Sequence, residues 1–303
     1  MQVVITGATS FIGVHLIERW MKEDCCIYAV VRKNSNNIDR IPISNRVRVV
    51  ELNMQEYAEL PLIIKHADVF YHLAWDGVRA PWRDDQQVQK ENYICTINAM
   101  EAASKMGCTL FVGSGSQAEY GIVNGPVDES HPCNPSTEYG KYKLRAYETL
   151  SHMAKRFNVR LIWLRIFSLY GEFDYSGSLI MSCINSFSRN EPLKMTACTQ
   201  KWDYLYIKDA VEAMFRFAVI NCEDGVYHIA NGNSRPLKDY VEEIKSIMHS
   251  ESTIEYGAIP YGPNGPVNLE PIAKRVQRTL NWKANTLFTS GILSILHRES
   301  DNE

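Results

Sequence analysis

The chain begins MQVVITGATSFIG (residues 1–13), and this stretch predicts the fold. Residues 3–6 form a short apolar run of the kind found in buried strands. A turn of small side chains follows, and the pattern of a helix comes next. A strand, a tight turn and a helix N-terminus together bind phosphate, because the backbone can approach the anion and the helix dipole favours its charge. We therefore predict that this turn binds the pyrophosphate of a dinucleotide, and the residues expected at it are Gly7, Ser10, Phe11, Ile12 and Gly13.

The same alternation of short apolar runs and amphipathic stretches continues along the chain. The runs that predict strands are residues 3–6, 27–31, 47–52, 69–73, 110–112, 159–167 and 226–230. The stretches that predict helices include residues 14–22, 93–105, 144–155 and 209–218. Runs that are apolar on both faces are typical of a parallel sheet covered by helices on both sides. The sequence therefore predicts an α/β fold with a doubly wound parallel sheet of the Rossmann type.

The pattern changes after residue 171. Residues 172–192 and 231–282 are richer in Gly, Pro and Asn, and the run YGAIPYGPNGP (256–266) can form neither a long helix nor a central strand. We predict a dinucleotide-binding domain of residues 1–171 with 200–230. A smaller, discontinuous C-terminal lobe of residues 172–199 with 231–303 would pack on the sheet and bind the substrate.

Composition excludes several classes of function. The 303 residues carry a net charge of −3, which gives no electrostatic basis for binding nucleic acid or an anionic membrane. No apolar run reaches the roughly 18 residues that a membrane span needs. The eight cysteines form no C-x-x-C pair and no Cys/His cluster with zinc-ligand spacing, so we expect no metal. Scattered thiols in a chain of this size favour reduced cysteines and a cytoplasmic protein.

The end of the second predicted strand bears on the choice of dinucleotide. An acidic residue there would bind the ribose 2′-hydroxyl of NAD, but the sequence is AVVRKNS (29–35). Arg32 and Lys33 could instead bind the 2′-phosphate of NADP. Two basic residues in a loop are also ordinary on a protein surface. The sequence therefore favours NADP(H) and leaves NAD(H) possible.

A second group of residues indicates acid–base chemistry. Tyr139 and Lys143 are four residues apart on a predicted helix, so their side chains lie on the same side. A nearby ammonium would lower the pKa of the phenol, which could then exchange a proton with an alcohol oxygen. This spacing is common on surface helices. Here, however, it follows GSGSQAEYG (113–121), which places hydroxyl groups at the carboxyl edge of the sheet.

With these segments in place, the chain resembles an extended short-chain dehydrogenase/reductase of the NAD(P)-dependent epimerase/dehydratase family, whose substrates are mostly nucleotide sugars. Further matches, in family order, are HLA (72–74), Asn92, RIFSLYG (165–171), WDYLYIKDA (202–210) and LNW (280–282). One departure is Ser10, which stands where the middle glycine of the phosphate turn is usual.

The resemblance implies roles for individual residues. Ser116 occupies the catalytic Ser/Thr position, Tyr139 is the acid–base group, and Lys143 would tune Tyr139 and hold the nicotinamide ribose. Asn53 stands where the family often has an Asp near the adenine. The remaining residues that the resemblance places at the cofactor are Leu73, Ala74 and Asn92.

The residues after Ser116 narrow the reaction. Dehydratases of the family carry an Asp-Glu pair there, but Gln117 and Ala118 cannot transfer a proton, so we do not expect dehydration. Fucose-type epimerase-reductases need an additional Cys and His, and we interpret His131 and Cys133 as structural. Reduction of a keto sugar and 4-epimerisation through a transient ketone remain. The basic pair at residues 32–33 favours the reductase, as does a looser resemblance to bacterial synthases that reduce the 4-keto group of nucleotide-linked 6-deoxy sugars. A non-catalytic NADP-binding sensor is a third alternative.

The second lobe is expected to hold the substrate. The epimerase segment Arg-Asp-Phe, which helps hold the nucleotide, is replaced by Trp202-Asp203-Tyr204, so another cation would bind the diphosphate. The residues predicted to bind substrate are Trp75, Ser116, Ser168, Arg235 and Arg275, and Lys201 is a further candidate cation. By resemblance we also expect a homodimer formed through helices at residues 92–105 and 141–155.

Overall fold

The structure is a computed structural model, and it describes residues 1–123 and 125–300. Its centre is a seven-stranded sheet in the order β11-β6-β5-β4-β1-β2-β3, and every pair of neighbours is parallel. The strands are β1 (Gln2–Thr6), β2 (Cys26–Val31), β3 (Val47–Glu51), β4 (Val69–His72), β5 (Leu110–Ser116), β6 (Arg160–Ile166) and β11 (Gly225–Ile229). From β1 the strands are added in one direction as far as β3, and the chain then returns to place β4 on the other side of β1. This reversal of strand order confirms the predicted doubly wound fold.

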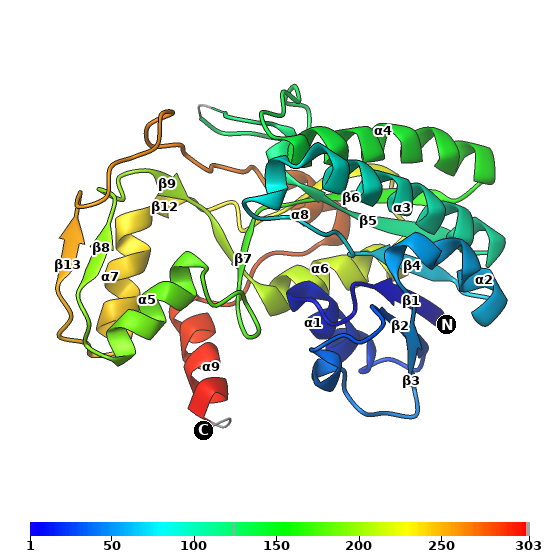
Figure 1. The fold of residues 1–303 in the computed structure, drawn as a ribbon, viewed down its shortest axis with the longest axis horizontal. Coiled ribbons are helices and arrows are strands. Elements are labelled where there is room, and N and C mark those ends of the chain that lie inside the picture. The colour runs from blue at the N-terminus through cyan, green and yellow to red at the C-terminus, as the bar shows by residue number, and fades with distance from the viewer. Residues whose placement is uncertain (124, 301–303) are drawn as a thin grey trace.

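Helices cover both faces of this sheet (Figure 1). On one face, α1 (Phe11–Trp20) packs against α6 (Ile207–Val219), and on the other α3 (Gln86–Lys105) packs against α4 (Glu138–Phe157). Strand β1 shows why. Val3 and Ile5 belong to the core beneath the first pair of helices, whereas Val4 belongs to the core beneath the second. A strand buried on both faces has to be apolar throughout.

The second lobe lies to one side of the sheet (Figure 1). It contains α5 (Leu179–Ser188), α7 (Leu237–Ile247) and α9 (Phe288–Ser300), with two small ladders that join β8 (Leu193–Met195) to β13 (Ile254–Tyr256) and β9 (Lys201–Trp202) to β12 (Arg235–Pro236). We did not predict α5 or α7. Their surroundings are rich in Gly, Pro and Asn, and that composition obscured two amphipathic helices whose apolar faces are buried.

The remaining elements are short. They are β7 (Ser168–Tyr170), β10 (Tyr204–Tyr206), α2 (Leu60–Ile63), α8 (Lys274–Leu280) and the 3-10 turns η1 (Ile38–Arg40), η2 (Met54–Glu59), η3 (Trp82–Asp84) and η4 (Gln117–Glu119). In the part of the chain that the structure describes, no helix is long and apolar enough to cross a membrane.

Strand β5 is longer than predicted and ends at the candidate active site. The expected strand stopped at residue 112, but β5 continues through GSGS to Ser116. The two glycines belong to the strand because the indole of Trp163, on the neighbouring β6, lies against them. A side chain added at Gly113 would lie 2.5 Å from that ring, and one at Gly115 would also collide with it. The extension places Ser116 at the carboxyl edge of the sheet.

Candidate active site

The turn after β1 is built to bind an anion. Gly7 has a φ of +66°, and a side chain there would lie 2.8 Å from the backbone nitrogen of Ala74. Ser10 replaces the usual middle glycine and caps α1, since its Oγ accepts a hydrogen bond from the N–H of Gly13 at 3.1 Å. The N–H groups of Phe11 and Ile12 lie in the first turn, where a helix offers no carbonyl partner. These features fit a dinucleotide pyrophosphate.

The two cations after β2 differ in their surroundings. The Nζ of Lys33 lies 2.5 Å from Oε1 of Glu56, so its charge is already paired. The Arg32 side chain is 66% exposed, and its Nη1 has a longer ion contact of 3.8 Å with Asp76. Of this predicted pair, Arg32 is therefore the cation better placed for a cofactor phosphate.

Two asparagines expected at the cofactor hold protein backbone instead. Asn92 is buried, and its amide group bonds both the N–H and the carbonyl of Asp76 at 2.8 Å. Asn53 caps η2, and its Oδ1 accepts a hydrogen bond from the N–H of Lys33. Backbone groups therefore engage the amide of Asn92, while the contact of both asparagines with the cofactor stays a prediction. Between them lies a pocket of about 380 Å³ lined by Met54, Gln55, Asp76, Gly77, Trp82, Val88, Glu91 and Asn92.

The structure brings the predicted Ser, Tyr and Lys together. Ser116 ends β5, while Tyr139 and Lys143 lie in the first two turns of α4, which is capped by Thr137. The Ser116 side chain lies near the Tyr139 phenol and lowers its pKa. The Nζ of Lys143 donates to the carbonyl of Ser114 at 2.6 Å. A hydroxyl, a phenol and an ammonium thus meet at one sheet edge.

The expected effect of Lys143 on Tyr139 is not found. Burial raises the pKa of Tyr139 and outweighs the hydrogen bond from Ser116 and the charge of Arg83, both of which lower it. Burial also lowers the pKa of Lys143 to about 7. The ammonium lies 3.7 Å from the centre of the Trp75 ring and 5.8 Å from that of Tyr139. Burial thus dominates the pKa of Tyr139 while the lysine faces Ser114 and Trp75, and the tuning of the phenol by Lys143 stays a prediction.

The loop after β4 supplies a residue that the sequence did not reveal. The guanidinium of Arg83 lies 4.6 Å from the centre of the Tyr139 ring, and its Nη1 donates to the carbonyl of Val78. The neighbouring Asp84 accepts a hydrogen bond from the N–H of Glu138 and so fixes the loop to the start of α4. Nothing in the spacing of this loop distinguishes Arg83 from a surface base.

Trp75 is placed as predicted, at the Ser-Tyr-Lys group. Its ring meets that of Tyr139 edge-on at 6.1 Å, and its Nε1 donates to Gln89 at 2.8 Å. Ser168 begins β7 and accepts a hydrogen bond from Nε1 of Trp202 at 2.9 Å. Arg235 lies on β12 beside Trp202.

Each of the three candidate cations for a diphosphate already contacts protein groups. Nζ of Lys201 lies 3.0 Å from Oε2 of Glu270. Nη2 of Arg235 lies 2.5 Å from Oε2 of Glu243, and its guanidinium stacks on Tyr240, so most of its charge is used inside the lobe. Arg275 stacks on Tyr227 next to Gly225, the first residue of β11. That is the amino end of the strand, four residues from the end beside Ser116. Arg275 is therefore corrected: it lies at the opposite edge of the sheet from the Ser-Tyr-Lys group.

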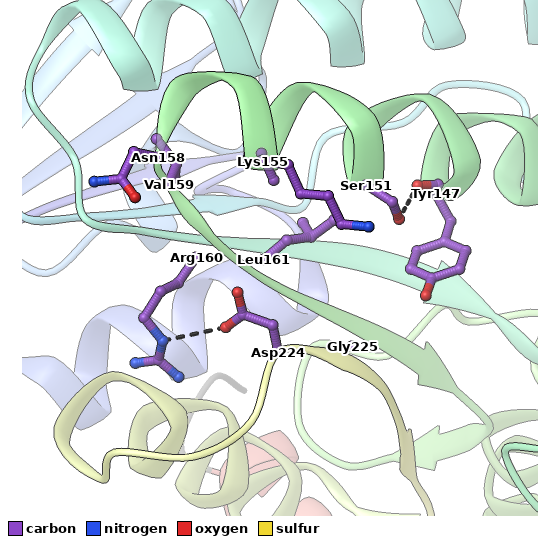
Figure 2. Close-up of a pocket in the computed structure, with 10 residues that line it drawn as sticks. Tyr147, Ser151, Lys155, Asn158, Val159, Arg160, Leu161, Asp224 and Gly225 are labelled. Carbon is purple, nitrogen blue, oxygen red and sulfur yellow. Dashed lines mark hydrogen bonds and ion pairs between the residues drawn. The ribbon is translucent and has the colours of Figure 1, made fainter.

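A larger pocket also lies at that opposite edge. Figure 2 shows it between the second half of α4, the start of β6 and the loop before β11, with a volume of about 420 Å³. The ion pair of Arg160 with Asp224 forms part of its wall. Cofactors of doubly wound sheets bind at the carboxyl edge. We therefore do not assign this pocket to the cofactor or the substrate.

Comparison with known proteins agrees with this geometry. Residues 3–230 match the model of the NAD dependent epimerase/dehydratase family. The chain belongs to this family, so the resemblance seen in the sequence is confirmed, as is the prediction of an enzyme.

Individual relatives cover the whole chain. CDP-abequose synthase of Salmonella muenchen is 26% identical over 299 residues, which is 97% of each chain. dTDP-4-dehydro-6-deoxyglucose reductase of Escherichia coli is 26% identical over 307 residues, covering 96% of this chain and 95% of the relative. Among solved structures, a UDP-glucose 4-epimerase of Thermotoga maritima superposes with a TM-score of 0.88 over the full length of both chains at 19% identity, which shows the shared fold.

Proposed function

We propose that this protein uses NADPH to reduce a keto group, at C4, of a nucleotide-linked deoxy sugar. The observation that carries the proposal is the meeting of Ser116, Tyr139 and Lys143 at the carboxyl edge of the sheet, beside a turn that fits a dinucleotide. The similarity to a dTDP-4-dehydro-6-deoxyglucose reductase along nearly the whole chain supports the substrate class and the position of the keto group.

The three side chains have separate tasks. A bound nicotinamide supplies the hydride that reduces the carbonyl carbon. Tyr139 donates its proton to the resulting alkoxide, and a raised phenol pKa keeps that proton in place until it is needed. Ser116 hydrogen-bonds the same oxygen, which stabilises the charge that develops on it. Lys143 is buried, with its Nζ 5.8 Å from the centre of the Tyr139 ring, and we propose that it holds the nicotinamide ribose when the cofactor is bound.

The residues after Ser116 support reduction over dehydration. Gln117 and Ala118 have no proton to transfer at neutral pH. The nearest carboxylate in the sequence, Glu119, is fully buried and bonded to β6, so it cannot act as the acid of an elimination.

The preference for NADPH rests on Arg32. No acidic residue stands at the end of β2, and the exposed guanidinium of Arg32 can form a bidentate contact with a 2′-phosphate. A 4-epimerase would use the same Ser116 and Tyr139 but would retain NAD and regenerate it within each turnover.

The test is a cofactor titration followed by an assay. One portion of the purified protein is denatured to release any bound nicotinamide. The native remainder is titrated with NADPH and NADH and then supplied with 4-keto-6-deoxy nucleotide sugars or with a single C4 epimer of a nucleotide sugar. The proposal expects weakly held cofactor, tighter binding of NADPH, and oxidation of NADPH that depends on the sugar. Tightly retained NAD with interconversion of two C4 epimers would replace the proposal with a 4-epimerase. Binding of NADPH without turnover of any sugar would favour the sensor.

We also propose that two chains associate through α3 and α4. The two helices pack side by side on one face of the sheet, and Ile94 on α3 is 45% exposed. Light scattering after gel filtration tests this: a mass near 34.6 kDa would contradict the dimer.

A further inference from the structure

Glu119 is a buried carboxylate that the proposed mechanism does not use. It is the last residue of η4, three positions after Ser116, and it has no exposed surface. Its oxygens accept hydrogen bonds from three donors: the N–H of Ser116 at 2.8 Å, Nε1 of Trp163 at 3.0 Å and Nε of Arg165 at 2.7 Å. An ionised group is costly to bury unless it is paired in this way.

The neighbouring strands are shaped around this carboxylate. In the parallel pairing of β5 with β6, Gly113 is opposite Trp163 and Gly115 is opposite Arg165. A side chain at Gly115 would lie 2.6 Å from Oε1 of Glu119 and would also overlap the indole of Trp163. Glycine at position 115 therefore leaves the space in which Glu119 and Trp163 meet.

The same short turn holds the catalytic hydroxyl. Oγ of Ser116 accepts a hydrogen bond from the N–H of Ala118 at 3.1 Å and lies near the phenol of Tyr139. On its other side, Gly140 in the first turn of α4 packs directly against the carbonyl of Ala118. The turn is thus held between the ion pair on β6 and the helix that carries Tyr139.

We propose that Glu119, through its ion pair with Arg165, is a positioning residue that fixes Ser116 against Tyr139. This inference rests on the proposed function, because it concerns the same hydroxyl and phenol. Glu119 does not touch the substrate. It holds the N–H of Ser116, and the backbone so fixed directs Oγ toward the reacting oxygen.

A buried ion pair could also serve stability alone, and a matched control separates the two roles. Glu172 is a second buried carboxylate, paired with Lys208 at 2.8 Å and bonded to Tyr206 at 2.9 Å. Glu119→Gln and Glu172→Gln each remove one buried charge from one pair. Both should lower the melting temperature, but only Glu119→Gln should lower kcat, on the order of 100-fold for a catalytic group displaced by about 1 Å. The KM for the sugar and the Kd for NADPH should stay within about threefold of wild type.

Glu119→Asp is a second variant that keeps the proposal testable if Glu119→Gln does not fold. It keeps a charge for Arg165 but shortens the side chain by one methylene, so it should retain most of the stability and still lower kcat about tenfold. Wild-type kcat in Glu119→Asp, or in a folded Glu119→Gln, would overturn the proposal.

A double-mutant cycle tests whether Glu119 acts through Ser116. In a Ser116→Ala background, Glu119→Gln should lower kcat by no more than about twofold further, because the group that it positions is gone. An equal loss in both backgrounds would overturn the proposal.

Failure of this inference can be told apart from failure of the proposed function. The proposed function is tested on the wild-type protein alone, whereas the inference is tested by comparing the variants with wild type. If wild type epimerises instead, the cycle is run on that reaction, which uses the same hydroxyl. If wild type turns over no sugar, crystal structures of wild type and Glu119→Gln with NADPH decide: Oγ of Ser116 should shift relative to the Tyr139 phenol in the variant, and an unchanged geometry would overturn the inference.

Discussion

The two halves of the sheet's carboxyl edge are built differently. Beside β5 and α4, Ser116, Tyr139 and Lys143 are 8%, 8% and 2% exposed, and protein groups contact each of them. Beside β2, the side chains of Arg32 and Lys33 are 66% and 46% exposed. The groups of the chemical step are therefore fixed before a ligand arrives. The groups that would choose the cofactor lie on the surface and can be changed without disturbing the core.

The largest effect should come from the buried half. Tyr139→Phe removes the proton donor and keeps the ring that packs on Trp75. We expect kcat to fall by about 100-fold to 10,000-fold, the range for loss of a general acid. The Kd for NADPH, measured by fluorescence titration, should stay nearly unchanged. Activity within a few fold of wild type would show that the buried group is not the catalytic one.

A smaller effect should come from the exposed half. Arg32→Glu would place a negative charge near the 2′-phosphate, and NADPH binding should weaken by about 10-fold to 100-fold while NADH binding changes little. Lys33→Gln is the matched control. Because Lys33 is already paired with Glu56, its loss should weaken NADPH binding less than threefold. Equal effects of the two variants would remove the distinction between these cations.

The two arginines predicted to bind the diphosphate allow a similar comparison of a variant with its control. Arg235→Ala should raise the KM for the nucleotide sugar a few fold, because part of its charge is held by Glu243. Arg275→Ala should leave KM and kcat within about twofold, because Arg275 lies at the amino edge of the sheet. A larger rise in KM for Arg275→Ala would contradict its placement.

Buried histidines beneath the carboxyl edge should make stability depend on pH. Burial lowers the pKa of His72 and of His228 to about 3, from an ordinary value of 6.5. Their contribution is complete above pH 6.5 and is lost as the pH falls from there toward 3. Asp203 opposes them, since burial raises its pKa to about 6 and protonation below that pH favours the folded state. The two histidines together have a larger effect than Asp203. The free energy of unfolding should therefore fall by on the order of 2 kcal/mol between pH 7 and pH 5.

Urea unfolding at several pH values measures this dependence. Nitrogen-15 spectra of the imidazoles should also show two histidines that remain neutral at pH 5. Stability that stays level or rises toward pH 5 would contradict the assigned burial of these rings.

Sequence reasoning predicted the sheet and the Ser-Tyr-Lys group because both depend on local pattern. The turn at residues 7–13 and the four-residue spacing of Tyr139 and Lys143 are visible in the chain itself. The supporting contacts are not. Arg83 reaches Tyr139 from a loop about 55 residues earlier in the chain, and Arg165 reaches Glu119 from a neighbouring strand. Arg165 meets Glu119 only because β5 and β6 pair in the folded sheet, and Arg83 meets Tyr139 only because the loop after β4 packs on the start of α4.

The same limit applies to other residues that were predicted to bind a ligand. Asn92, Arg235 and Arg275 each have a side chain suited to a ligand. The structure shows that protein groups already occupy Asn92 and Arg235 and that Arg275 lies at the wrong edge of the sheet. Whether a polar side chain is available depends on its partners, and those partners are distant in sequence.

The most direct test of the central claim follows the hydride. Wild-type protein is incubated with NADPH that carries deuterium at C4 of the nicotinamide, together with a 4-keto-6-deoxy nucleotide sugar, and the product is analysed by mass spectrometry and NMR. Reduction predicts one deuterium at C4 of the sugar and one equivalent of NADP⁺ for each sugar reduced. A keto sugar recovered unreduced with no NADPH consumed, together with interconversion of the two C4 epimers of a 4-hydroxy nucleotide sugar without deuterium incorporation, would contradict the proposed reductase.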